Sequence, residues 1–234
     1  MPSPQEIRDA NLAYLNKHGF QPATWMPLPN EVGTPAEGGF ASGVLRPAEE
    51  IAIRLMCHCA VFAWGSAPPE FEEPIAAFIE DNDLRAHLMG QETVIMGLSK
   101  SDATAQFAEV VGWRLENMWA LAWLLGLAEE PSAIIGQLPP EVSGLLMGLF
   151  LPDFTATVAT LTSGDLQPVE EVIRAEDLFY LAHNAVRSGQ LGELDRIPEG
   201  FDPIGSGGAI HERRHSLTWA LAPGTRWHET DLST

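Results

Sequence analysis

The sequence predicts an all-α fold: a single-domain helical bundle around a buried central helix, with irregular arms and at most a short β segment. Three observations predict it. Apolar residues recur at helical spacing, most completely over residues 103–125. Residues that start or end helices, chiefly Pro, Ser, Asp and Gly, separate the apolar segments. No alternation of apolar and polar residues is long enough to form a sheet, and no segment is repeated.

The first predicted helix covers residues 4–18, and Gly19 is placed to end it because glycine tolerates the left-handed backbone of a helix terminus. Residues 20–29 hold three prolines, so this segment is predicted to be an extended arm or one short edge strand. The Gly-rich residues 30–43 are predicted to form a loop.

Pro47 opens the second predicted helix, since proline suits a first helical turn, and two glutamates follow it where the helix dipole favours acids. Pro68 and Pro69 end this helix. A third and shorter helix is predicted over residues 70–81.

The most apolar segment, residues 103–125, is predicted to be the buried central helix. Ser101 or Asp102 can cap its start, and Gly126 is placed to end it. Its main apolar stripe consists of Ala108, Val111, Leu115, Met118, Ala122 and Leu125. Further helices are predicted over residues 141–149, 154–161, 168–187 and 209–221, with a Gly- and Pro-rich loop over residues 188–208.

The length and the charge restrict the possible partners. The 234 residues fit one domain, which we place at residues 1–234. The chain carries 13 Lys and Arg against 32 Asp and Glu, a formal net charge of −19. Because phosphate backbones and anionic lipids bind proteins through Lys and Arg, we expect no nucleic-acid partner and no membrane partner. A basic protein partner suits this charge.

A cytoplasmic location is expected. Residues 1–10 lack the apolar core of a secretory signal. The longest apolar run, residues 142–151, is shorter than the roughly 20 residues that span a bilayer. Cys57 and Cys59 are the two cysteines of the chain, and such sparse usage suits a reducing compartment better than a disulfide scaffold.

The sharpest motif is His211-Glu212-Arg213-Arg214-His215, which has the His-Glu-x-x-His spacing of zinc metalloproteases. On a helix, His211 and His215 share a face, so they can bind one zinc ion while Glu212 serves as the catalytic base that activates its bound water. This motif raises a metal-dependent hydrolase as an alternative function.

Two features of the same motif oppose zinc. Two arginines separate the histidines, and guanidinium groups repel a divalent cation. The third ligand of the metzincin pattern is missing, and the tail residues His228, Glu229 and Asp231 are the other candidates for it. We therefore expect no cofactor, with zinc as the one exception that the motif allows.

Cys57, His58 and Cys59 also group potential metal ligands in a short segment. Residues two apart on a helix point about 200° apart, so the two sulfur atoms diverge. Free cysteine is also among the most buried residue types. This segment is therefore predicted to belong to the core.

Charged and polar side chains interrupt three apolar helical segments. Buried charges must pair with one another or bind a ligand. They can form one ion network that fixes the helices, for example Arg114 with Asp177 or with Glu212, or they can line a pocket for a small molecule. The candidate binding residues are Arg114, Glu116, Asp177, His183 and Arg213.

Several of these segments together resemble a known family. The segments are residues 113–116 (WRLE), 121–126 (LAWLLG), 177–185 (DLFYLAHNA), 212–219 (ERRHSLTW) and 227–234 (WHETDLST), with a weaker match at residues 47–52. In this order they resemble the bacterial family of domain of unknown function 4272. The resemblance implies a helical, cytoplasmic bacterial protein and implies no activity, substrate or cofactor.

The resemblance also bears on the zinc motif. The family pattern has the Glu-Arg pair and the later Trp without the two flanking histidines, so it implies that His211 and His215 are local features of this chain. It favours a shared structural or functional site made of Arg114, Glu116, Asp177, Glu212 and Arg213. We expect a non-catalytic binding or interaction protein, with the metal-dependent hydrolase and a small-molecule-binding protein as alternatives.

Overall fold

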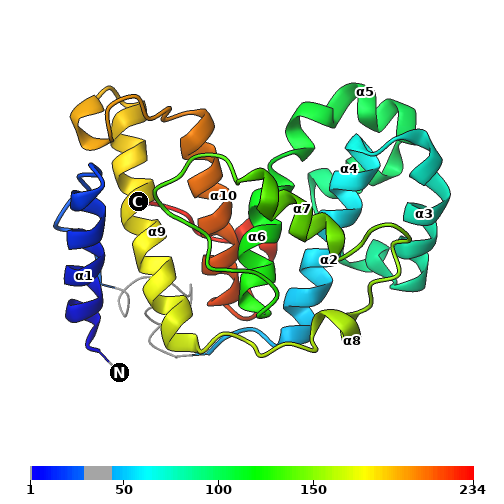
Figure 1. The fold of residues 1–234 in the computed structure, drawn as a ribbon, viewed down its shortest axis with the longest axis horizontal. Coiled ribbons are helices and arrows are strands. Elements are labelled where there is room, and N and C mark those ends of the chain that lie inside the picture. The colour runs from blue at the N-terminus through cyan, green and yellow to red at the C-terminus, as the bar shows by residue number, and fades with distance from the viewer. Residues whose placement is uncertain (1, 29–43) are drawn as a thin grey trace. The chain divides into compact units, whose positions relative to one another are not determined.

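The computed structural model describes residues 2–28 and 44–234, and within these residues it contains ten α-helices, four short 3₁₀ helices and no strand (Figure 1). The predicted all-α class is confirmed. The chain divides into two compact units, each described separately below. Unit 1 comprises Met1–Arg46, Pro131–Gln137 and Gln167–Thr234, and unit 2 comprises Pro47–Glu130 and Leu138–Leu166. The single-domain boundary of 1–234 stays a prediction.

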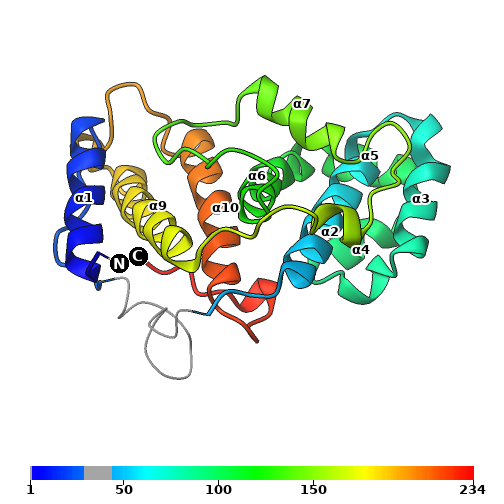
Figure 2. The ribbon, with the colours of Figure 1, turned by 60° about the horizontal axis from the view of Figure 1, so that its bottom comes forward.

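Unit 1 is built on three helices: α1 (Pro4–Lys17), α9 (Val169–Gln190) and α10 (Gly205–Ala220). The two views show α9 lying between α1 and α10 (Figures 1 and 2). The Ser3 hydroxyl accepts a hydrogen bond from the Glu6 N–H, and the Glu6 carboxylate accepts one from the Ser3 N–H. This capping box fixes the start of α1.

Helices α9 and α10 pack closely because a glycine faces α9. A Cβ atom at Gly207 would lie 2.4 Å from Cγ1 of Val186, closer than any real contact. Only a residue without a side chain lets the two helix backbones approach this far.

The arm that follows α1 forms no strand over its described part, residues 20–28. Phe20 is fully buried, and the Gln21 N–H donates to the carbonyl of Arg196 at 2.8 Å. The Ala23 N–H donates to Oδ1 of Asn184 on α9, also at 2.8 Å. The arm is therefore held by hydrogen bonds to a side chain of α9 and to the carbonyl of Arg196, and because residues 24–26 form a turn and a bend it is not extended throughout. The loop predicted over residues 30–43 lies outside the described residues.

Unit 2 surrounds α2 (Ala48–Ser66), of which 12 of 19 residues are buried. Packed against α2 are α3 (Glu72–Asp81), α4 (Gln91–Gly97), α5 (Lys100–Val111), α6 (Arg114–Leu124) and α8 (Val158–Leu161). Helix α7 (Pro140–Gly148) packs on α6. The short helix α4 was not predicted, and α8 covers only the end of the predicted segment 154–161.

The predicted central helix over residues 103–125 is two helices, so that prediction was wrong. The hydrogen-bond ladder tightens around Gly112 and Trp113, where the Leu115 N–H donates to the Gly112 carbonyl and the Glu116 N–H to the Trp113 carbonyl. Helix α6 is buried from Glu116 to Leu124, whereas α5 is largely exposed and its stripe residue Ala108 points to solvent. The low helix propensity of glycine favours the break at this junction.

No helix in the described part of the chain is both long enough and apolar enough to cross a membrane.

Candidate functional site

Six of the chain's Lys and Arg side chains are buried, and each donates hydrogen bonds to backbone carbonyls. An irregular segment or a helix end leaves carbonyl groups without helical partners, and a buried cation with several donors can satisfy a group of them. The six residues are Arg8, Arg46, Arg54, Lys100, Arg213 and Arg214.

Asp177 is fully buried on α9 and pairs with Arg8 of α1. Nη2 of Arg8 lies 2.7 Å and its Nε 3.0 Å from Oδ1 of Asp177, and the Asn11 amide donates to Oδ2 at 2.9 Å. Arg8 also donates to the carbonyls of Met26 and Pro27 in the arm. The pair of Asp177 with Arg114 was therefore the wrong prediction, because Arg8 supplies the charge that Asp177 needs.

Arg214 is the centre of a second buried cluster in unit 1. Its Nε lies 3.2 Å from Oε1 of Glu176, and the Thr218 hydroxyl donates to the same oxygen at 2.9 Å. Its Nη1 donates to Nδ1 of His183 at 2.9 Å, and its guanidinium lies 4.6 Å from the centre of the Tyr180 ring. Two oppositely charged groups, both about 1% exposed, are thus matched inside unit 1.

The tail residues also depend on Arg214. Its guanidinium donates to the carbonyls of Leu232 at 2.9 Å and of Ser233 at 3.3 Å. It therefore joins α10 to both α9 and the end of the chain. The sequence placed this arginine only as a middle position of the zinc motif.

The buried cluster shifts two pKa values. Burial, helped by the Arg214 guanidinium, lowers the pKa of His183 to about 3. Because a guanidinium only donates, Nδ1 of His183 accepts, and the imidazole is neutral with its proton on Nε2. Burial raises the pKa of Glu176, although Arg214 and Thr218 act in the opposite direction.

Arg213 binds the backbone of a loop. Its guanidinium donates to the carbonyls of Ser132, Ile135 and Gly136, at 2.8, 3.0 and 2.5 Å. Arg213 is fully buried. These contacts fix the short stretch of unit 1 that lies between two parts of unit 2 in the sequence.

The two candidate residues of unit 2 also have structural contacts. Oε1 of Glu116, which is buried, accepts a hydrogen bond from the Leu138 N–H at 2.9 Å, just before α7 begins. Nη1 of Arg114 lies 3.4 Å from Oε1 of Glu92. Glu92 also pairs with Arg54 at 2.6 Å and lies 3.9 Å from Nδ1 of His58.

This cluster around Glu92 was missed in the sequence because Glu92 belongs to a short helix whose pattern is weak. The charged Arg54 in the apolar α2 was the available signal, since a buried charge needs a partner and an acid is one that can supply it.

The His-Glu-x-x-His motif lies on α10, and its two histidines contact protein groups in a way that does not suit metal binding. Nε2 of His215 lies 2.9 Å from the carbonyl of Trp227, and the two rings stack with centres 4.1 Å apart. A carbonyl only accepts, so Nε2 carries a proton and donates, which removes its lone pair from metal binding. Nδ1 of His211 lies 3.3 Å from Oε1 of Glu212.

The described residues contain no group of three or more His, Cys, Asp or Glu side chains placed to hold a metal ion. The Cys-His-Cys segment is core, as predicted: Cys57 and Cys59 are buried, and burial raises the pKa of Cys57 to about 11. A thiol with this pKa stays protonated at neutral pH, and the thiolate is the form that binds metals.

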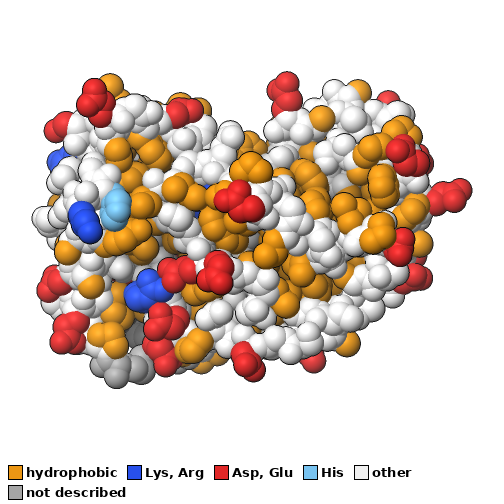
Figure 3. Space-filling view, viewed as in Figure 1, with side chains coloured by type: hydrophobic (Ala, Val, Ile, Leu, Met, Phe, Trp, Pro, Cys, Tyr) orange, Lys and Arg blue, Asp and Glu red, His pale blue; other side chains and the backbone are white. Residues whose placement is uncertain are grey.

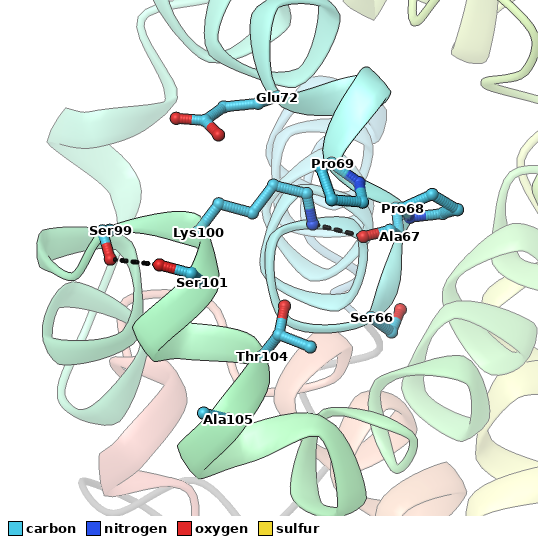
Figure 4. Close-up of a pocket in the computed structure, with 10 residues that line it drawn as sticks. All are labelled: Ser66, Ala67, Pro68, Pro69, Glu72, Ser99, Lys100, Ser101, Thr104 and Ala105. Carbon is cyan, nitrogen blue, oxygen red and sulfur yellow. Dashed lines mark hydrogen bonds between the residues drawn. The ribbon is translucent and has the colours of Figure 1, made fainter.

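A hollow in unit 2 was not predicted (Figure 4). It has a volume of about 620 Å³ and lies between the end of α2 and the start of α5. The buried Lys100 crosses it, and its ammonium donates to the carbonyls of Ala63, Trp64 and Ala67 at the end of α2. A cation at a helix C-terminus is favourable, so Lys100 supplies the basic residue that α2 lacks in its last turn.

Polar groups line the same hollow on both sides of Lys100 (Figure 4). Ser99 and Ser101 hold their hydroxyl oxygens 3.0 Å apart, and Thr104 lies one turn further along α5. Glu72 lies on the other side of Lys100. Burial lowers the pKa of Lys100, whereas the carboxylates of Glu72 and Glu70 raise it. The hollow can therefore accept a small molecule with hydrogen-bonding groups.

The outside of the chain is more acidic than its net charge indicates. All 13 Lys and Arg lie in the described part of the chain and six of them are buried, whereas only four of the Asp and Glu in that part are buried. Figure 3 shows acidic side chains over much of the viewed face and few basic ones. The buried acids are Glu92, Glu116, Glu176 and Asp177.

The family described as Domain of unknown function (DUF4272) has a model that matches residues 13–230. The chain belongs to this family. The DUF4272 match includes the segments on α6, α9 and α10 that carried the resemblance, and it ends four residues before the end of the chain. The family description assigns no function. The chain has no match among the curated proteins or among the solved structures.

Proposed function

We propose that the protein is a non-catalytic binding protein that recognises a basic protein partner through its acidic surface. The distribution of its cations carries this proposal. Six Lys and Arg side chains are used inside the molecule to bind carbonyls, so the exposed charge is dominated by carboxylates. A surface of one sign attracts an oppositely charged partner over distance and accelerates its association.

The same charge argues against other partners. A nucleic acid or an anionic membrane would have to approach this surface against repulsion. The proposal includes a cytoplasmic location, supported by two buried thiols that are not joined in a disulfide. Cell fractionation that recovered the protein outside the cytoplasm would contradict that part.

Three of the candidate binding residues and one candidate metal ligand have contacts that support a non-catalytic role. Asp177, Arg213 and Glu116 each hold a backbone segment or another helix, and His215 donates to a carbonyl. Groups that are committed to such contacts are poorly placed to exchange protons with a substrate.

The test is capture of partners from the organism's own lysate on the immobilised full chain. Washing at low salt and eluting with NaCl should release basic proteins, because screening weakens contacts between exposed charges. An unrelated protein of equal negative charge is the control. The proposal fails if nothing is enriched over this control, or if the enriched proteins are acidic.

A second function is favoured by the hollow around Lys100, namely binding of a small polar molecule. Its volume of about 620 Å³ is in the range of ligand pockets. A metabolite screen by thermal unfolding should then find a compound that raises the melting temperature. The rise should vanish in Thr104→Leu, which fills the hollow, and persist in the control Thr93→Leu at an exposed position of α4. A screen without any stabilising compound would contradict this function.

The metal content of the protein distinguishes the third possible function, a metal-dependent hydrolase, from the two binding functions above. Elemental mass spectrometry of untagged protein would have to find about one zinc ion per chain, lost in His211→Ala, for that alternative to stand.

A further inference from the structure

Three aliphatic side chains stand far out of the surface of unit 1, in the connection between α9 and α10. Leu191 is 79% exposed, Leu194 64% and Ile204 69%. A single exposed leucine is ordinary, but three such side chains within 14 residues of one connection concentrate exposed apolar surface there, which is a mark of interaction sites. We call Leu191, Leu194 and Ile204 the α9–α10 patch.

A hydrogen bond brings the two ends of this connection together. Leu191 is the capping residue directly after α9, and Leu194 begins the 3₁₀ helix η4 (Leu194–Arg196) three residues later. The Gln190 side chain donates to the carbonyl of Pro203 at 2.7 Å, which places Ile204 beside the end of α9. The connection between α9 and α10 therefore has a defined conformation, held by a hydrogen bond between its ends and containing a 3₁₀ helix.

A hollow of about 630 Å³ adjoins the patch. Leu194, the buried Ile197 and Phe201 give it apolar walls, and Phe201 packs edge-to-face on Phe20 with ring centres 5.1 Å apart. A hollow of this kind can accept one large apolar side chain of a partner, as the anchors of protein interfaces do.

Carboxylates surround the patch and the hollow. The segment of residues 191–204 contains four acids and one arginine, Arg196, which lies 3.3 Å from Glu193. The other exposed acids are Asp195, Glu199 and Asp202. Figure 3, viewed as Figure 1, shows acidic and apolar side chains together at its upper left, where the α9–α10 connection lies. An occupant must therefore combine apolar groups with positive charge.

We propose that the α9–α10 patch docks a basic amphipathic segment of a partner protein, with an aliphatic or aromatic side chain in the hollow and Lys or Arg against the acidic rim. This inference rests on the proposed function and names its surface. Apolar anchors give such a contact its affinity, and the charges give it orientation.

The test uses two synthetic peptides of equal positive charge and the full chain. One peptide combines Lys with Leu so that it forms an amphipathic helix, and the other has Ser in place of every Leu. Fluorescence anisotropy should show about tenfold tighter binding of the Leu peptide, the size expected for one good apolar anchor. The variant Leu191→Ser/Leu194→Ser/Ile204→Ser should bind both peptides equally.

The variant Val94→Ser/Val110→Ser is the matched control, since it removes exposed apolar side chains from unit 2 and should keep the tenfold preference. Urea unfolding of each variant checks that the fold is intact.

Equal binding of the two peptides by the unmodified chain overturns the proposal that the α9–α10 patch docks an amphipathic segment, while it leaves the acidic-surface proposal intact. Absence of binding to either peptide overturns both. A dimer seen by light scattering and lost in the triple variant would assign the patch to a second copy and also overturn the inference.

Discussion

Arg214 shows how a single buried side chain can organise several segments at once. It contacts Glu176 and His183 on α9 and two carbonyls of the tail, while it belongs to α10. A buried pair of this kind adds little net stability over apolar residues, but removal of one partner leaves a charge without compensation. The sensitivity of the fold should therefore be concentrated at such residues.

The variant Arg214→Met tests this at the residue scale. It leaves the Glu176 carboxylate buried without its guanidinium, so the free energy of unfolding should fall by about 3–5 kcal/mol in urea titrations. Hydrogen exchange at the end of the chain should also become faster. Arg226→Met is the control, because its side chain is 69% exposed, and it should change stability by less than about 0.5 kcal/mol. Equal effects of the two variants would contradict the role of Arg214.

His183 predicts a dependence of stability on pH. Its pKa is about 3 in the folded chain against 6.5 ordinarily, so between these values the unfolded chain binds a proton that the folded chain does not. Stability should therefore fall as the pH decreases from 6.5 towards 3, by at most about 1.4 kcal/mol per pH unit. The raised pKa of Glu176 acts in the opposite direction above its ordinary 4.5, because the folded chain then holds the extra proton.

The contribution of His183 is isolated by His183→Gln, which keeps an acceptor for Arg214 and does not titrate. Chemical unfolding between pH 4 and 7 should give a flatter curve for this variant than for the unmodified chain. His228→Gln, at a half-exposed position, is the control and should leave the curve unchanged. Parallel curves for all three proteins would show that His183 is not the titrating group.

At the scale of elements, close approach and capping decide how the helices pack. Gly207 lets α10 lie against α9, and Lys100 of α5 caps the end of α2. The packing of α10 on α9 depends on the absence of a side chain at Gly207, and the capping of α2 depends on one side chain, that of Lys100. Neither contact follows from apolar periodicity, which indicates only the buried face of a helix.

Gly207→Ala should therefore destabilise the chain by about 1–3 kcal/mol, because its new methyl group overlaps Val186. In the double variant Gly207→Ala/Val186→Ala the loss should be smaller than the sum of the single losses, since the smaller side chain makes room. Gly144→Ala on α7 is the control: its Cβ meets nothing within 4 Å, and it should be neutral or stabilise by up to about 1 kcal/mol. Additive losses in the double variant would exclude the overlap as the cause.

At the scale of the whole molecule, the excess of negative charge affects the stability of the folded chain. With a formal net charge of −19 and many of its cations buried, the folded chain gathers carboxylates that repel one another. Such repulsion keeps a protein soluble but opposes its compact state.

Addition of NaCl should therefore raise the free energy of unfolding, on the order of 1 kcal/mol between low salt and about 0.5 M, because ions screen this repulsion. The variant Glu109→Gln/Glu141→Gln/Asp153→Asn removes three exposed acids of unit 2 and should reduce the response. Chemical unfolding at fixed pH measures both. A decrease of stability with salt would mean that favourable ion pairs outweigh the repulsion.

The sequence by itself determined the all-α class, the position of most helices and the family. Helical spacing of apolar residues and the punctuation by Pro and Gly are local properties, so they can be read along the chain. The same holds for the burial of Asp177, Glu116 and Arg213, which interrupt apolar helical segments. Arg114 and Glu212, which the same pattern also placed inside, are 15% and 25% exposed. The one-helix prediction over residues 103–125 was wrong because apolarity continued across Gly112 while the backbone did not.

Only the tertiary structure decided which charges meet. Arg8 pairs with Asp177 across 169 positions of sequence, and Arg214 finds Glu176, Thr218 and the tail through the packing of α10 on α9. Partner choice depends on the angles and distances between helices, which no local pattern contains. The α9–α10 patch likewise required the fold, because the exposure of a side chain is a property of the packed chain. In the sequence, its leucines are only part of a Gly- and Pro-rich loop.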